Sequence, residues 1–228
     1  MKKLSLFLSV LLIINLFPLY TYAQVNDVST AEISVILTNE ENPSETHIIT
    51  LPVNPEQNSI NTSTVNGDIN VTTDVIVSIP DDDSDTPDIN ISTRTKVNDA
   101  LSIASSQTNT GSDSSGSYKA SITCTYNSNT SGYLLTKVNG SWTKQDPNVS
   151  ISNREVIYAC TSGTQQSQRT VKKPSSSTYS YSTGYSKRVK DVGSTLLGGV
   201  ASCKLKRGTG SKWNFTVNCN VIKNSVGW

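Results

Sequence analysis

His47 is the only histidine in the 228-residue sequence, so it is the only imidazole that could act as a general base. Nucleophilic catalysis of the Ser-His-Asp or Cys-His type needs such an imidazole beside the nucleophile. His47 begins a short apolar run, and no G-x-S-x-G nucleophile motif stands near it. The sequence therefore favours a surface histidine over a hydrolytic triad.

Paired carboxyl groups, which glycoside hydrolysis requires, are also hard to find in this sequence. The C-terminal half has only Asp146, Glu155 and Asp191, all near turn signals. The acidic run at residues 81–85 admits a calcium site, but it lacks the spaced ligands and closing Glu of an EF-hand, and a solvated loop is favoured. The sequence predicts no enzyme, no catalytic or metal residues, and no cofactor.

Four cysteines are the strongest chemical signal in the chain: Cys124, Cys160, Cys203 and Cys219. An even number of cysteines in an exported chain indicates two disulfides, whereas a metal site would want a CxxC pair and more histidines. Cys203 and Cys219 lie eight residues either side of Ser211, on the apolar faces of two alternating runs. The predicted pairs are Cys203–Cys219 and, by elimination, Cys124–Cys160.

Two further groups of side chains could bind ligands. Tyr179, Tyr181 and Tyr185 alternate along one stretch, where they either pack in a core or form an exposed row that stacks on glycan rings. A basic group either forms the wet face of a sheet or holds anionic polymers electrostatically. Its members are Lys187, Arg188, Lys190, Lys204, Lys206, Arg207 and Lys212.

The elements that must position these residues are β-strands. Residues 201–205 and 213–221 alternate strictly between apolar and polar side chains, with a turn at Gly208, Gly210 and Ser211 between them. Asn139-Gly140 is a strong hairpin signal, which predicts a type I′ turn. Short strands spaced about 8–12 residues apart, with no convincing helical period, predict an all-β fold, an antiparallel β-sandwich.

Charge divides the chain into unequal parts. The predicted divisions are a signal peptide at 1–23, an acidic β segment at 24–104, a flexible Ser/Thr/Gly-rich linker at 105–117, and a basic disulfide-bearing β domain at 118–228. Residues 24–113 hold 15 acidic and 2 basic residues, a net charge of −13, whereas residues 114–228 hold 3 acidic and 15 basic residues, a net charge of +12. The signal peptide predicts a secreted, extracellular protein without a transmembrane segment in the mature chain.

Several local patterns recur together: VTTDVIVSIP, a Ser-rich gap, then ASITCTYN, KVNGSW, SNREVIYAC and SYSTGY. In this combination the chain resembles a set of uncharacterised secreted proteins of low-GC Gram-positive bacteria. The resemblance implies a secreted all-β fold and a bacterial origin. It carries no activity and no functional residues to this chain.

These patterns favour a secreted, non-enzymatic β protein that binds anionic cell-envelope polymers or glycans through its basic half, in association with the cell wall. No nucleic-acid partner is expected. One alternative is an extracellular hydrolase that acts on envelope glycans. Another is a secreted toxin or antagonist whose acidic segment masks the basic half until release. Electrostatic masking predicts that residues 114–228 alone bind a polyanion more tightly than the mature chain does.

Overall fold

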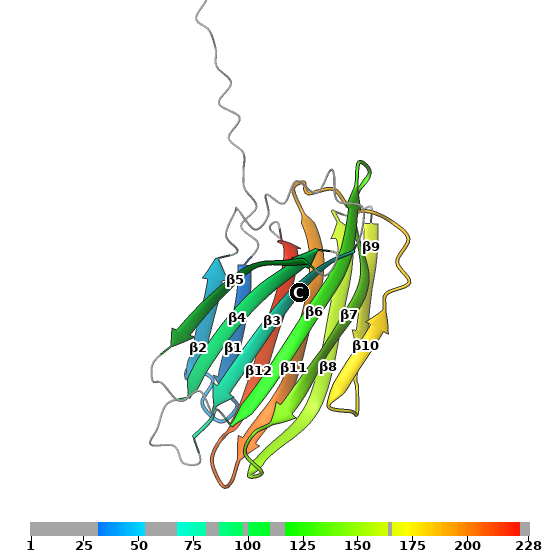
Figure 1. The fold of residues 1–228 in the computed structure, drawn as a ribbon. Helices are drawn as coiled ribbons and strands as arrows, with labels where there is room; N and C mark the ends of the chain where they lie inside the picture. The colour runs from blue at the N-terminus through cyan, green and yellow to red at the C-terminus, as the bar shows by residue number, and fades with distance from the viewer. Residues whose placement is uncertain are drawn as a thin grey trace, which may run out of the picture.

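Two antiparallel sheets packed face to face make up the fold (Figure 1). A computed structural model describes residues 32–52, 68–80, 87–97, 100–109, 117–163 and 166–223. These residues form twelve strands and no helix, which confirms the predicted all-β class and the sandwich. No helix of the described residues is long and apolar enough to cross a membrane.

Each sheet contains six strands. Sheet I has the order β2 (Thr46–Pro52), β1 (Glu32–Asn39), β12 (Lys212–Lys223), β11 (Thr195–Arg207), β8 (Val149–Ser162) and β9 (Gln166–Lys172). Sheet II has the order β10 (Thr178–Ser182), β7 (Gly132–Lys144), β6 (Tyr118–Asn129), β3 (Asp68–Ser78), β4 (Asp88–Val97) and β5 (Ala100–Asn109). Alternate side chains of each central strand face the other sheet and form the core.

The hairpin of β11 and β12 confirms the period-2 prediction for this part of the chain. Ala201 pairs with Val217 and Leu205 pairs with Trp213, and all four side chains are buried. Phe215, between them on the same face, meets Tyr118 of sheet II edge to face, with ring centroids 5.2 Å apart. The apolar face of the hairpin thus lies against the facing sheet.

Neither predicted disulfide is present in the structure, where all four cysteines are buried free thiols. Cys203 lies opposite Phe215, and Cys219 lies opposite Gly199. The turn is centred two residues before Ser211, since Gly208 has a φ of 52° and the Gly210 amide donates to the Arg207 carbonyl at 3.0 Å. This shift of the turn moves the two cysteines out of register.

The predicted Asn139-Gly140 turn is also wrong, because β7 runs through it without a break. Gly140 pairs with Ile122 on one side and with Tyr179 on the other. A Cβ atom at Gly140 would overlap the Ser121 carbonyl and the Tyr179 ring. The glycine is required here for close packing of an aromatic ring, not for a turn.

The acidic and basic parts of the chain share both sheets. β1 pairs with β12, with Val35 opposite Val217, and β3 pairs with β6, with Val71 opposite Cys124. Residues 105–109 of the predicted linker lie in β5, while residues 110–116 lie outside the described residues. The predicted signal peptide and the acidic run at 81–85 also lie outside them, so cleavage before Gln24 stays a prediction.

Candidate functional site

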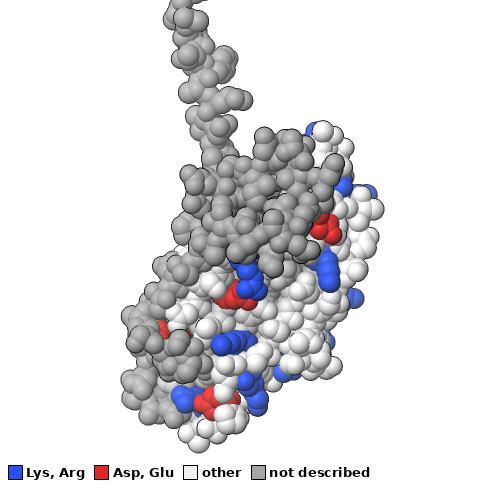
Figure 2. Space-filling view, in the orientation of Figure 1, with Lys and Arg blue, Asp and Glu red and all other residues white. Residues whose placement is uncertain are grey.

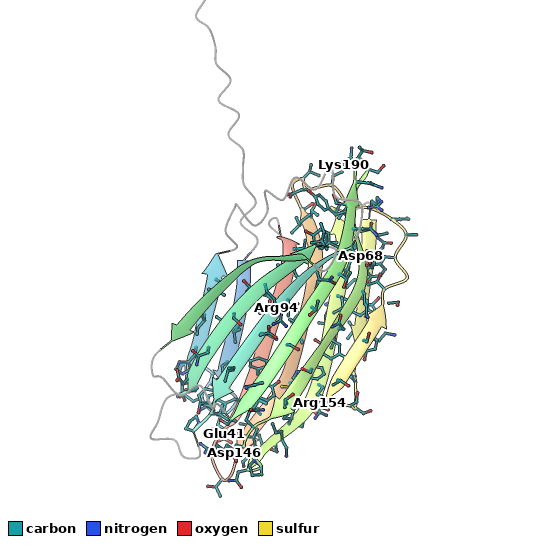
Figure 3. The ribbon with its side chains drawn as sticks, viewed as in Figure 1. Glu41, Asp68, Arg94, Asp146, Arg154 and Lys190 are labelled. Atoms are coloured by element: carbon teal, nitrogen blue, oxygen red, sulfur yellow. The ribbon has the colours of Figure 1, made fainter. Side chains whose placement is uncertain are left out.

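The seven predicted polyanion-binding residues do not form one surface. Lys204, Lys206, Arg207 and Lys212 belong to or adjoin the β11–β12 turn, whereas Lys187, Arg188 and Lys190 lie between β10 and β11. Figure 3 shows Lys190 at one end of the sandwich, and at the other end Asp146, which is the partner of Arg207. The basic residues that are neighbours in sequence are therefore divided between the two ends.

Two cations at the β11–β12 end are bound to acidic groups. Lys204 forms an ion pair with Glu40, and the Arg207 Nε donates to Asp146 at 2.6 Å. The pKa of Asp146 is lowered by the hydrogen bond from the Asn148 backbone amide and by Arg207. The Arg207 Nη1 also donates to the Ile79 carbonyl at 3.2 Å. These two cations therefore stabilise contacts between loops and strands of the protein itself.

Arg188 at the other end is likewise structural. Its guanidinium donates to the Asn127 carbonyl, to the Asn127 side-chain oxygen at 2.6 Å, and to the Gly132 carbonyl at 3.0 Å. These bonds hold the segment between β10 and β11 against the β6–β7 turn, next to the isolated bridge of Val189 with Tyr133. The flanking Lys187 and Lys190 remain exposed.

Exposed cations from three segments gather where β9 and β10 form neighbouring edges of the two sheets. We call this surface the basic edge, and its residues are Lys137, Arg169, Lys172, Lys173, Lys187 and Lys190. Figure 2 shows basic side chains recurring along the margin of the molecule on which β10 lies. Sequence patterns predicted Lys187 and Lys190, whereas Arg169, Lys172 and Lys173 were missed because β9 resembles a polar loop.

Hydrogen bonds from Gln168 fix the basic edge. Its side-chain nitrogen donates to the Lys187 carbonyl at 2.6 Å, and its side-chain oxygen accepts from the backbone amides of Ser186 and Lys187. These bonds bring the segment after β10 alongside β9. Lys172 lies with its Nζ 6.0 Å from the centre of the Tyr181 ring. The basic edge thus lies beside a cluster of tyrosines.

Of the two alternatives for the three tyrosines, packing in the core is the one that the structure shows. Alternate side chains of β10 point between the sheets, so Tyr179 is only 6% exposed and packs on Trp142, with ring centroids 4.7 Å apart. Tyr181 stacks between Tyr179 and Tyr158. Tyr185 donates from its hydroxyl to the Tyr158 carbonyl at 3.0 Å. Tyr181 and Tyr185 are partly buried, so part of each ring reaches the surface of the basic edge.

A polar groove of about 840 Å³ opens on the outer face of sheet I and includes Lys173 of the basic edge. Its floor contains Ser202, Asn214 and Thr216. At its side, Asn153 and Arg154 form a β-bulge opposite Cys203, and Asn153 has a φ of 51°. The bulge bends β8 beside the groove, and Lys173 connects the groove to the basic edge.

Three of the residues considered for hydrolysis each contact a different group in the structure. Asp146 is bound to Arg207, and Glu155 lies 3.9 Å from Lys173. His47 packs beside Trp213, and its Nε2 has no hydrogen-bond partner among the described residues. Within those residues, no group of three His, Cys, Asp or Glu side chains could hold a metal ion.

A second hollow, of about 450 Å³, lies on the outer face of sheet II and contains Asp74. Arg94 donates to the Asp74 carboxylate at 3.1 Å. Burial raises the pKa of Asp74, and the charge of Arg94 offsets part of that increase. Asp74 was not among the residues singled out in the sequence, because its burial follows from neighbouring strands that are distant in sequence.

Asp74→Asn is expected to stabilise the protein at neutral pH. A carboxyl group whose pKa is higher in the folded protein than in the unfolded chain destabilises the fold above that pKa, and the asparagine removes this penalty. The gain should shrink as the pH falls through the folded pKa and be absent below the unfolded pKa, because the wild-type carboxyl is then neutral in both states. Thermal unfolding across acidic and neutral pH measures the effect, with Asp68→Asn at the exposed start of β3 as control. A loss of stability at neutral pH would mean that the Arg94 contact outweighs burial.

In comparisons with known proteins, no family model, curated protein or solved structure matches this chain. The resemblance to secreted proteins of low-GC Gram-positive bacteria therefore stays a prediction. The basic edge, with its partly buried tyrosines and the adjoining groove, is the strongest candidate site on the described surface.

Proposed function

We propose that this protein is an exported, non-enzymatic β-sandwich protein that binds anionic polymers of the cell envelope through the basic edge. The observation that carries this proposal is the convergence of six exposed cations from β7, β9 and the segments that follow β9 and β10. Two sheets hold these segments in place, so the cations remain grouped without a bound partner.

The chemistry of the basic edge suits a charged glycan or a phosphate-bearing polymer. Exposed ammonium and guanidinium groups attract a polyanion without a tailored pocket, because the summed field of several like charges raises the local concentration of counter-ions. The accessible parts of Tyr181 and Tyr185 lie next to Lys172 and Arg169 and offer apolar surface to sugar rings. Tyr179 is buried and takes no part in binding.

The two alternative functions gain less support. A glycan hydrolase needs a pair of carboxyl groups across a cleft, and the carboxylates Asp146 and Glu155 are each engaged with a basic side chain. A removable acidic mask requires a segment that can leave. Because β1 pairs with β12 and β3 pairs with β6, departure of the acidic segment would dismantle both sheets.

Sedimentation with purified cell walls tests the proposal. The variant Arg169→Gln/Lys172→Gln/Lys187→Gln should bind about 10- to 100-fold more weakly than wild type at low salt, because each exposed charge contact contributes roughly 0.5–1 kcal/mol. Wild-type binding should fall as salt rises, since exposed charges are screened over about 8 Å at physiological ionic strength.

The matched control is Lys144→Gln/Lys206→Gln/Lys212→Gln, which removes the same charge at the opposite end of the sandwich. It should bind nearly as well as wild type. Equal losses in both variants would indicate a response to net charge alone and would contradict a binding surface at the basic edge. Release of sugars or peptides from the walls would instead support the hydrolase.

A further inference from the structure

Two cysteines from opposite sheets meet in the core. Cys124 lies on β6 of sheet II and Cys219 on β12 of sheet I, and both side chains are fully buried. The structure brings two cysteines to 3.8 Å from each other. The pair whose thiols interact through a hydrogen bond is Cys124 and Cys219. The Cys124 thiol also donates to the Cys219 carbonyl at 3.5 Å, and the Cys219 thiol donates to the Val71 carbonyl at 3.3 Å.

Strands β6 and β12, which carry the two cysteines, approach each other closely. Packed sheets are typically about 10 Å apart, whereas Cα atoms of β6 and β12 come within 8 Å of each other. Gly199, which pairs with Cys219, leaves the space for this approach: a Cβ there would lie 3.4 Å from the Cys124 sulfur and 3.1 Å from Ile122. Disulfides join Cα atoms about 4.4–6.8 Å apart, so a local closing of the sheets reaches the required range.

The other two cysteines lie among different partners. The Cys203 sulfur is 3.2 Å from the Tyr118 hydroxyl. The Cys160 sulfur lies near the Tyr133 and Lys187 carbonyls, at 4.0 and 3.7 Å. Neither thiol has a cysteine among these partners, so the Cys124–Cys219 pair is the one that the fold brings together.

We infer that Cys124 and Cys219 form a disulfide that joins the two sheets when the chain folds in an oxidising compartment. This inference rests on the expectation of export and goes beyond the proposed binding function. The oxidant is an external disulfide such as oxidised glutathione. One cysteine thiolate attacks it, forms a mixed disulfide and releases one glutathione thiolate, and the second cysteine thiolate then attacks the protein sulfur and releases the other. Two protein thiols lose two electrons, and the two released thiolates take up the two protons.

The bond forms while the core is still open. Burial raises the pKa of Cys124 well above its usual value, and the thiolate is the form that attacks a disulfide. Exchange in the closed, reduced protein should therefore be slow, whereas exchange during refolding should be fast. Once formed, the bond raises the denaturation midpoint, because it restricts the unfolded chain.

Refolding of the reduced mature chain in a glutathione redox buffer tests the inference. Thiol titration after denaturation should find two free thiols instead of four, and non-reducing peptide mapping should join the peptides of Cys124 and Cys219. The Cys160→Ala/Cys203→Ala variant should still form the bond and retain no free thiol. Cys124→Ala should keep its three thiols free.

Four free thiols in the refolded wild-type protein, or a mapped bond that includes Cys160 or Cys203, would overturn the inference. Mapping of the wild-type protein decides the matter even where an alanine variant does not fold. Reduction of the mapped bond should lower the urea midpoint, and an unchanged midpoint would show that the pair does not constrain the two sheets.

Discussion

Residues 114–228 expressed alone are expected to remain unfolded. In that fragment β12 loses its partner β1 and β6 loses its partner β3, so both sheets are cut through the middle. Ten buried apolar side chains come from the missing part: Val35, Leu37, Ile49, Leu51, Ile69, Val75, Val77, Ile79, Ile89 and Ile91. At about 1.5–3 kcal/mol each, their burial is worth roughly 15–30 kcal/mol, which exceeds the about 5–15 kcal/mol net stability of typical domains.

Circular dichroism and amide dispersion in NMR spectra measure the outcome, with the full mature chain as the folded reference. A disordered fragment would also explain any weak or salt-insensitive binding that it shows to cell walls. A folded fragment that binds more tightly than the whole chain would instead restore the masking hypothesis and contradict the interleaved sheets.

Phe215→Ala is expected to cost about 3–5 kcal/mol of unfolding free energy, because it opens a cavity at a site that is fully buried. The ring lies between Leu37 and Cys203 in sheet I and meets Tyr118 of sheet II edge to face. Loss of that contact removes apolar burial and an aromatic pair together. A loss of this size is a large fraction of the total stability.

Urea denaturation gives the difference, and Thr216→Ala is the matched control. Thr216 is the next residue of β12, on the outer face, where a substitution should change stability by about 0.5 kcal/mol or less. Similar losses for the two variants would show that the two faces of β12 do not differ in burial, which contradicts the sandwich.

Central strands were predictable from sequence because their two faces differ. The alternation in residues 201–221 predicted both strands of the β11–β12 hairpin and the side that faces the core. The edge strand β9 gave no such signal. β9 has the sequence QSQRTVK and forms because its backbone completes the hydrogen bonds of β8. Gly140 shows the opposite kind of error. The local sequence predicted a turn there, but the residue lies within a strand and packs closely against Tyr179.

The candidate site was predictable only in part, for a related reason. Lys187 and Lys190 could be recognised as exposed cations, but their neighbours Arg169 and Lys172 depend on the pairing of β9 with β8. Arg188 and Arg207 have the same composition signal as the free lysines, yet each is bound to groups about 60 positions away. Local sequence cannot distinguish a cation that binds a ligand from one that binds its own fold.

The pairing of β1 with β12 sets the order in which the chain can fold. Val35 lies opposite Val217, 182 positions later. β1, one of the earliest strands to be synthesised, therefore cannot pair with β12 until the last strand has been synthesised. Closing so long a loop costs conformational entropy before the native contacts can offset that cost. Folds rich in distant contacts therefore form slowly. A chain interrupted before residue 217 exposes the edge of β1 and the apolar face beneath it. If the protein is exported as proposed, this delay would leave the chain without its completed sheets until residue 217 has been translated.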